Sequence, residues 1–391
     1  MFDQSNITGS DRSLVEAALP YCYYCRRKLI LWSPNEVRNQ TCPECYSYLQ
    51  EFVQSPAQDE LCVVKELEQL VGEPIPAIPT TTLRSIITEP QSDSITGYAV
   101  NDGQHITGLL LPKKGMMTLP HSIGKLTELE VLSLTQNELT YLPETVGDLR
   151  KLEEVGVSEN MLRSLPKSFL TLPLRVLDLR YNHVSVLSGP LPKSLEILDL
   201  SYNQLDKLPT VTENNSLTQL YAEVNQIRAV TEEQLNTPNL QILVLNNNKI
   251  RHFSPEFSTL NELRILDLGK NQLTELPDVS DNLVLRELYA ENNKLRNVET
   301  TLPSSLEILD LSYNKLDKLP DDFERLSNLR VVDLMWNNLH DLPDYLIDLP
   351  LLEALYVGGN PIGNQTKQKF RQLEDRGCRI NWNVKLNWVS G

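Results

Sequence analysis

The sequence predicts an α/β solenoid: similar units stacked into a horseshoe, with a parallel β-sheet on the concave face. Three observations predict this fold. Leucines recur at a fixed spacing, one asparagine recurs at the same place in the units, and a Leu-Pro pair follows it in several of them. Units of 21 to 23 residues are too short to bury an apolar face alone, so they must pack on their neighbours. They begin at Ile106, Leu129, Leu152, Leu174, Leu195, Leu217, Leu240, Leu263, Leu285, Leu306, Leu329 and Leu352.

One unit shows how the pattern specifies the fold. Leu306, Leu309, Leu311, Asn314 and Leu316 follow L-x-x-L-x-L-x-x-N-x-L, the spacing of a leucine-rich repeat. In the L-x-L part, side chains alternate between the two faces of a strand, so the leucines point inward and the residue between them points outward. The Leu-Pro pair begins a descending segment with helical or 3₁₀ character, because proline fits the first turn of a helix.

A column of asparagines is predicted to join the units. An asparagine amide both donates and accepts hydrogen bonds, so inside the stack it can satisfy backbone groups of adjacent turns. Only the first unit departs from the column, with Lys114. The column comprises Asn137, Asn160, Asn182, Asn203, Asn225, Asn248, Asn271, Asn293, Asn314, Asn337 and Asn360.

The first unit exposes an apolar face, and we expect residues 61–105 to cover it as an N-terminal cap. Apolar residues at helical spacing predict a helix at Cys62–Val71, with Cys62 facing the core. A hairpin with strands at Gly97–Val100 and His105–Leu111 follows, and its second strand is the first strand of the array.

The twelve repeats fill residues 106–362, and residues 363–391 are predicted to form the C-terminal cap. We expect a helix at Gln365–Arg376, ended by Gly377, and a strand at Arg379–Trp382. Cys378, between these two elements, is expected to be buried in the cap.

Four cysteines near the N-terminus have the spacing of a zinc site. Cys22, Cys25, Cys42 and Cys45 form two C-x-x-C pairs separated by sixteen residues. Each pair delivers two thiolates to one tetrahedral ion, and the segment between the pairs forms a hairpin that brings them together. We therefore expect a zinc-ribbon-like module with one structural Zn²⁺ at residues 21–50, between a flexible N-terminus at 1–20 and a linker at 51–60.

Charge and composition exclude several classes of partner. The net charge of −16 argues against a general nucleic-acid or anionic-membrane binder and favours partners with a basic surface. No run of eighteen apolar residues exists, so no membrane span is expected. The N-terminus has no basic segment followed by an apolar one, and the paired cysteines suit a reducing compartment with a metal better than a disulfide framework. These features predict a cytoplasmic protein.

The repeat pattern also carries a family resemblance. Units with L-P-x-x-I-x-x-L-x-x-L-x-x-L-x-L-x-x-N resemble the intracellular leucine-rich repeat scaffolds of the plant Ras-group and Scribble type. The run VVKELEQLVGEPIP ahead of GYAV and HITGLLL is similar to the N-terminal flank of archaeal leucine-rich repeat proteins. The resemblance covers about residues 61–382 and implies a protein-binding scaffold inside the cell. It implies no particular ligand-contact residues.

Outward-facing strand positions provide a candidate binding surface on the concave face. They combine carboxylates with aromatic and aliphatic side chains, and neighbouring strands lie about 4.8 Å apart, so we expect a dense acidic strip. The strip would bind a basic, partly apolar protein segment, with the aromatic residues as anchors. The predicted partner-binding residues are Asp178, Asp199, Asp267, Asp310, Asp333, Tyr181, Tyr202, Tyr221, Tyr289, Tyr313, Trp336 and Tyr356.

Two functions remain open, together with the alternative that the concave surface has no binding role. The first is a non-enzymatic protein-protein interaction scaffold, because no P-loop, nucleophile elbow, zinc-protease or dinucleotide motif occurs. The second is a nucleic-acid-associated regulator that uses the cysteine module, where Arg26, Arg27 and Lys28 lie beside aromatic residues. The acidic charge favours the first. Alternatively, the L-D-L-S-Y-N sequence is only a common repeat consensus, and the β-branched residues beside it merely favour strands. The oligomeric state cannot be predicted.

Overall fold

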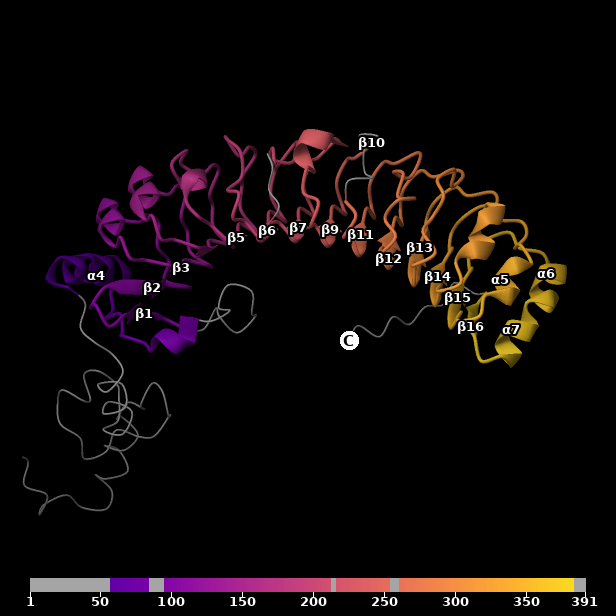
Figure 1. Cartoon of the computed structure of the whole chain (residues 1–391), viewed down its shortest axis with the longest axis horizontal. Helices are drawn as coiled ribbons and strands as arrows, with labels where there is room; N and C mark the ends of the chain where they lie inside the picture. The colour runs from indigo at the N-terminus through magenta and orange to yellow at the C-terminus, as the bar shows by residue number, and fades with distance from the viewer. Residues whose placement is uncertain (1–56, 84–94, 212–215, 254–259, 383–391) are drawn as a thin grey trace, which may run out of the picture.

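The computed structural model describes residues 57–83, 95–211, 216–253 and 260–382, which form one curved solenoid (Figure 1). Fourteen strands of these parts join in one sheet, in the order β1-β2-β3-β4-β5-β6-β7-β9-β11-β12-β13-β14-β15-β16. The sheet lines the inner side of the arc, as predicted. The strands are β1 (Gly97–Val100), β2 (Ile106–Leu110), β3 (Val131–Ser133), β4 (Glu154–Gly156), β5 (Val176–Asp178), β6 (Ile197–Asp199), β7 (Gln219–Tyr221), β9 (Ile242–Val244), β11 (Ile265–Asp267), β12 (Glu287–Tyr289), β13 (Ile308–Asp310), β14 (Val331–Asp333), β15 (Ala354–Tyr356) and β16 (Arg379–Asn381).

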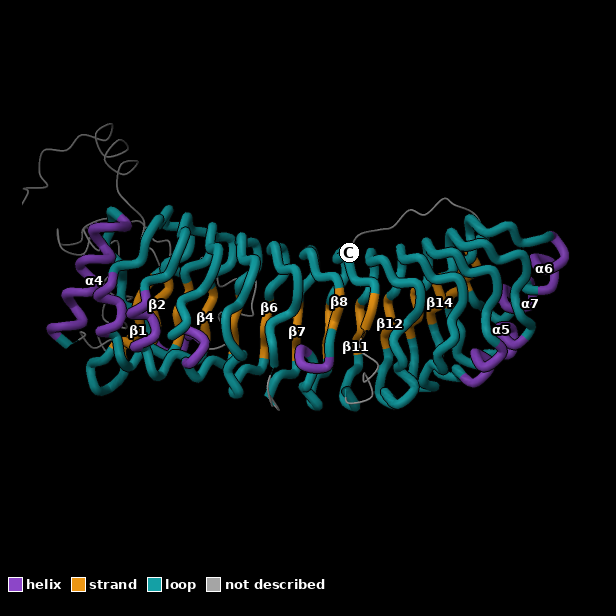
Figure 2. Tube along the Cα trace, turned by 90° about the horizontal axis from the view of Figure 1, so that it is seen from above, coloured by secondary structure: helices purple, strands orange, loops and turns teal. Residues whose placement is uncertain are grey.

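The sheet is parallel except at its first pair. β1 and β2 are antiparallel, which confirms the predicted hairpin, and each later strand pairs in parallel with the strand of the preceding repeat. Seen from above, the strands lie side by side along the molecule (Figure 2). Helix α4 (Gln58–Val71) lies at one end, and α5 (Tyr345–Asp348), α6 (Asn364–Lys369) and α7 (Arg371–Asp375) lie at the other.

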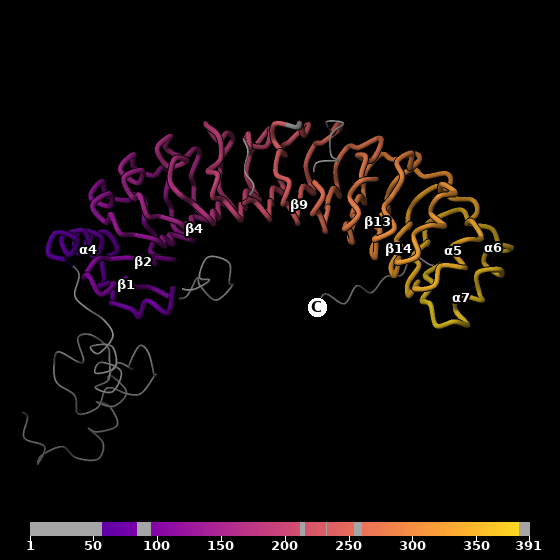
Figure 3. Tube along the Cα trace, in the orientation of Figure 1, coloured from indigo at the N-terminus to yellow at the C-terminus, as the bar shows by residue number. Residues whose placement is uncertain are grey.

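The outer side of the arc carries the descending segments of the repeats (Figure 3). In five of the described repeats a Leu-Pro pair is followed by one short helix, as the sequence predicted. β8 (Ala229–Val230) and β10 (His252–Phe253) form a second parallel sheet of two strands in the middle of the array. The short helices are η4 (His121–Lys125), η5 (Glu144–Asp148), η6 (Phe169–Thr171), η7 (Glu232–Gln234), η9 (Asp321–Arg325) and α5 (Tyr345–Asp348).

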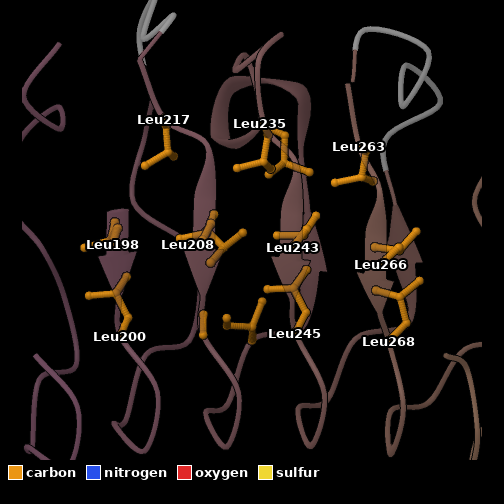
Figure 4. Packing of buried hydrophobic residues seen from close by; sticks show 14 of the residues in the cluster. Leu198, Leu200, Leu208, Leu217, Leu235, Leu243, Leu245, Leu263, Leu266 and Leu268 are labelled. Atoms are coloured by element: carbon orange, nitrogen blue, oxygen red, sulfur yellow. The ribbon is translucent and has the colours of Figure 1, made fainter. Parts of the chain in front are cut away.

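Leucines fill the space between the sheet and the outer segments. Leu198, Leu243 and Leu266 occupy the same place in three repeats and are fully buried (Figure 4). Each such side chain contributes about 2 kcal/mol of burial free energy. Because the same contacts recur in every unit, the core is one continuous cluster and its contacts lie between neighbouring repeats.

The asparagine column joins the repeats as predicted. Asn337 accepts hydrogen bonds from the backbone N–H of Leu316, at 2.9 Å, and donates to the carbonyl oxygen of Leu311, also at 2.9 Å. Both partners lie in the preceding repeat. The same amide donates to its own repeat at Leu334. Asn160 and Asn248 make the corresponding bonds, so the column satisfies buried backbone groups along the array.

The N-terminal cap is helix α4 (Gln58–Val71), which begins earlier than predicted and includes three residues of the expected linker. Glu60 explains the extra turn. Its carboxylate is 2% exposed and accepts hydrogen bonds from the backbone N–H of Ile106, at 2.7 Å, and from Nδ1 of His105, at 2.8 Å. The expectation for Cys62 was wrong: it is exposed, because Val63, Val64 and Leu67 form the buried face of the helix.

The predicted C-terminal helix is divided into two. α6 (Asn364–Lys369) and α7 (Arg371–Asp375) meet at Phe370, which is fully buried and contacts Trp382 edge to face. The chain bends there because Phe370 must enter the core of the last repeat. Gly377 follows with φ 88°, β16 extends the sheet, and Cys378 is buried as expected. None of the described helices is long and apolar enough to span a membrane.

Candidate protein-binding surface on the concave face

The strand register brings the predicted surface residues into columns. The aspartate column consists of the last residues of the main-sheet strands from β5 to β15, five of which are aspartates, and pairing places its members directly beside one another. Asp178 pairs with Asp199, and Asp310 pairs with Asp333. The column contains Asp178, Asp199, Tyr221, Val244, Asp267, Tyr289, Asp310, Asp333 and Tyr356.

The aspartates of this column also have a structural role. In each, one carboxylate oxygen accepts a hydrogen bond from the backbone N–H two residues later, as in Asp310 with Ser312 and Asp333 with Met335, both at 2.9 Å. This contact closes the turn at the end of the strand. The same contact occurs at Asp178, Asp199 and Asp267. The consensus alternative is therefore part of the explanation for the aspartates.

The aromatic column lies three residues after the aspartates, at one edge of the concave face. Its residues have positive φ, between 51° and 56°, and each immediately precedes one of the asparagines that join the repeats, the asparagine ladder. Tyr181 stacks on Tyr202 with ring centroids 4.1 Å apart, and Tyr313 stacks on Trp336 at 5.8 Å. All four are exposed, Tyr313 by 54% and Trp336 by 39%. Exposed stacked rings are suited to contact with another molecule.

The acidic strip is interrupted in the N-terminal half by an arginine. Arg180 donates to both oxygens of Asp178, at 3.0 and 2.9 Å, and its Nε lies 3.4 Å from Asp199. Its guanidinium therefore bridges two carboxylates on neighbouring strands. Sequence analysis did not include Arg180 among the site residues, although its place directly after the L-D-L of β5 was a usable signal.

In the C-terminal half the carboxylates are crowded. Among the described residues, no basic side chain forms an ion pair with Asp267, Glu291, Asp310 or Asp333. Burial and the neighbouring Asp310 raise the pKa of Asp333 to about 7. Burial and Asp267 raise the pKa of Glu291 to about 7, while burial raises the pKa of Asp310. At neutral pH the predicted strip is therefore only partly charged.

Glu291 was missed by sequence analysis. It follows β12 by two residues, at the same place as Arg180 after β5, and its carboxylate lies against the backbone of Gly269. A Cβ built on Gly269 would fall 2.1 Å from Oε1 of Glu291, so a side chain at this position would displace the Glu291 carboxylate. The sequence could have indicated this contact, because Gly269 and Glu291 occupy equivalent positions in neighbouring repeats.

The remaining predicted tyrosines are less available to a partner. The hydroxyl of Tyr289 donates to Glu287 at 2.8 Å, and that of Tyr221 donates to Gln219 at 3.0 Å. Burial raises the pKa of both phenols. Tyr356 is half-buried at the end of β15, beside Asn381 of β16.

The predicted zinc ligands Cys22, Cys25, Cys42 and Cys45 lie outside the described residues, as do the N-terminus 1–20, the module 21–50 and most of the linker. Elsewhere, across the ranges that the structure does describe, no group of three or more His, Cys, Asp or Glu side chains is arranged to hold a metal ion.

Comparison with known proteins agrees with this geometry. The family models described as leucine-rich repeat match residues 194–220, 238–295 and 304–362. Lumican of Rattus norvegicus is 38% identical over 110 residues, 27% of this chain and 32% of that protein. Fibromodulin of Gallus gallus is 34% identical over 127 residues, 31% of this chain and 33% of that protein. The match thus spans about a third of the length of these relatives.

Solved structures share the fold. One chain of the LRIM1/APL1C complex superimposes with a TM-score of 0.58 at 22% identity, covering 73% of this chain and 52% of that one. A curved array of leucine-rich units with a parallel sheet inside is the architecture that both the sequence and the structure define. Residues 194–220, 238–295 and 304–362 match leucine-rich repeat family models, and strands of the same architecture run along the described array.

The predicted cytoplasmic location is contradicted by the relatives. Lumican and fibromodulin are secreted proteins of the extracellular matrix. The repeat pattern had suggested intracellular scaffolds, but it reports packing inside the solenoid, which is the same in either compartment. The correction also removes the reducing compartment as a reason to favour zinc over disulfides at the four N-terminal cysteines.

Proposed function

We propose that this protein is a non-enzymatic interaction scaffold that binds a protein partner on its concave face. The observation that carries the proposal is the pair of exposed aromatic stacks, Tyr181–Tyr202 and Tyr313–Trp336, beside the paired aspartates. The related lumican and fibromodulin are non-enzymatic interaction proteins, and the similar solved structure is a complex of two proteins. A basic partner surface would complement the net charge of −16.

Site-specific photo-crosslinking tests this proposal. The full chain carries p-benzoylphenylalanine in place of Tyr202 or Trp336 on the concave face, or in place of Glu324 in η9 on the outer side as the matched control. After irradiation in an extract and in an extracellular fraction, we expect a discrete protein adduct from the two concave positions and none from Glu324. Adducts from Glu324 alone would contradict a concave binding face. An adduct with nucleic acid would instead support the alternative of a nucleic-acid-associated regulator.

We also propose that the four N-terminal cysteines bind one structural Zn²⁺. The support is their spacing alone, two C-x-x-C pairs sixteen residues apart. Metal content of the full chain should be one zinc per molecule, and Cys22→Ser with Cys25→Ser should remove it. Thiol titration after denaturation distinguishes the alternative: two free thiols, from Cys62 and Cys378, would mean that the four cysteines form disulfides.

A further inference from the structure

The concave face contains two similar arrangements of side chains, one of which already holds an arginine. Asp178 and Asp199 lie side by side on β5 and β6, with Tyr181 and Tyr202 stacked after them. The guanidinium of Arg180 bridges these two carboxylates. A planar guanidinium presents several N–H groups in a fixed fork, so it matches a pair of carboxylates on neighbouring strands.

The second arrangement lies in the C-terminal half. Asp310 and Asp333 are paired on β13 and β14 in the same register, and Tyr313 and Trp336 stack after them. In both arrangements one oxygen of each aspartate accepts the backbone N–H two residues later, so the carboxylates are held in the same way.

The difference is the residue between the aspartate and the aromatic ring. At the place of Arg180 the C-terminal arrangement has Ser312 after Asp310 and Met335 after Asp333. Neither side chain can neutralise the carboxylates. Like charges crowd there, since Asp310 and Glu291 both raise the pKa of Asp333 in addition to its burial. An added cation would relieve this repulsion.

We propose that Asp310 and Asp333, flanked by Tyr313 and Trp336, receive an arginine side chain from an extended segment of the protein partner, in the way that Asp178 and Asp199 hold Arg180. The carboxylates bind the guanidinium, and the exposed rings contact its plane and its aliphatic stem. The proposal rests on the proposed function and specifies its partner chemistry. It assigns binding to the C-terminal half, because the chain's own arginine occupies the N-terminal pair.

Two probes of equal shape test the charge. One is a fluorescein-labelled octapeptide that alternates arginine with alanine, and the other has citrulline, the neutral isostere, in place of arginine. Fluorescence anisotropy with the full chain should show binding of the arginine peptide at least about tenfold tighter than the citrulline peptide. Equal binding of both peptides, or no binding of the arginine peptide up to about 1 mM, would overturn the proposal.

Variants then locate the site. Asp310→Asn with Asp333→Asn keeps the oxygens that accept the backbone N–H groups and should weaken the arginine peptide at least about tenfold. Ser312→Arg supplies an internal arginine at the place of Arg180 and should abolish peptide binding. Arg180→Ser exposes the N-terminal pair and should raise the stoichiometry from one peptide to two. Unchanged binding by Ser312→Arg would refute the assignment. Thermal unfolding of each variant verifies that the solenoid is intact.

The outcomes separate this inference from the broader function. If the concave crosslinks form but the arginine peptide does not bind more tightly than the citrulline peptide, the scaffold function is supported and the arginine site is refuted. If no concave crosslink forms while the peptide binds as expected, the carboxylate pair recognises arginine but the proposed partner-binding function fails.

Discussion

Trp336 lies directly over Gly359 of the next repeat: a Cβ built on this glycine would fall 2.7 Å from Cδ2 of the indole. Gly359 has φ 81° and precedes Asn360, so it occupies the position that other repeats fill with Tyr181, Tyr202, Tyr313 or Trp336. The aromatic column therefore ends at Trp336, because its ring lies against the backbone of Gly359 and a side chain at that position would collide with the ring.

The contact predicts the effect of Gly359→Ala. The methyl group would displace the Trp336 ring and add strain at positive φ, so we expect unfolding to become easier by about 1–3 kcal/mol, together with altered near-ultraviolet circular dichroism. Gly377→Ala is the matched control, because its φ is also positive, 88°, but nothing lies within 4 Å of the added methyl. Equal changes in the two dichroism spectra would show that the ring contact is unimportant.

The asparagine ladder predicts a large difference between two adjacent residues. Asn337 is buried and its amide bonds to Leu316, Leu311 and Leu334, whereas the side chain of Asn338 is exposed. Asn337→Ala leaves buried backbone groups without partners and should lower the free energy of unfolding by about 2–4 kcal/mol. Asn338→Ala should change it by less than about 0.5 kcal/mol. Urea denaturation of both variants measures the difference, and similar midpoints would refute the structural role of the ladder.

The fold was largely predictable from the sequence because leucine and asparagine report interactions that repeat in every unit. Leu309 and Asn314 each have one kind of environment, so their spacing alone predicts the strand and the ladder. The candidate site was less predictable. The bridge from Arg180 to Asp199 and the position of Glu291 over Gly269 depend on side-chain directions across neighbouring strands, which the repeat period does not encode.

The raised pKa of Asp333 predicts how stability depends on pH. The folded-state pKa of about 7 lies above the usual value of 3.8, so the native protein holds a proton that the unfolded chain has lost between these values. Above pH 7 the buried Asp333 carboxylate is charged and therefore lowers the free energy of unfolding. This destabilisation diminishes as the pH falls toward 4. Asp333→Asn should raise the free energy of unfolding by about 1–2 kcal/mol at pH 8 and hardly at all near pH 4.

Asp341 provides a control with the opposite sign. Hydrogen bonds from Thr366 and from the N–H of Leu342 lower its pKa, so its charged form stabilises the native state above the unfolded pKa. Asp341→Asn should destabilise the protein at neutral pH, and the effect should disappear as the pH falls through the folded pKa. Thermal melts of both variants across the pH range test the two signs together. A stabilising effect of Asp341→Asn at neutral pH would contradict this account.

The N-terminal cap predicts a further dependence on pH. The hydrogen bond to Glu60 raises the pKa of His105 above its usual value. Protonated His105 therefore stabilises the docked α4 below the unfolded pKa, and this contribution is lost as the pH rises through the folded pKa. Wild type should be more stable than His105→Ala at about pH 5.5 and similar to it at about pH 8.5. Hydrogen exchange of α4 amides reports the cap directly, and protection that does not change over this range would refute the coupling.

The ladder bonds between repeats also have a direction. Asn160, Asn248 and Asn337 each reach back to the preceding repeat, through both the donor and the acceptor of the amide. A repeat that leaves the ribosome therefore carries the side chain that attaches it to the repeat made just before, and it satisfies buried backbone groups of that earlier repeat. The array can therefore form in the order of its synthesis, with each new repeat attaching to the repeat made before it.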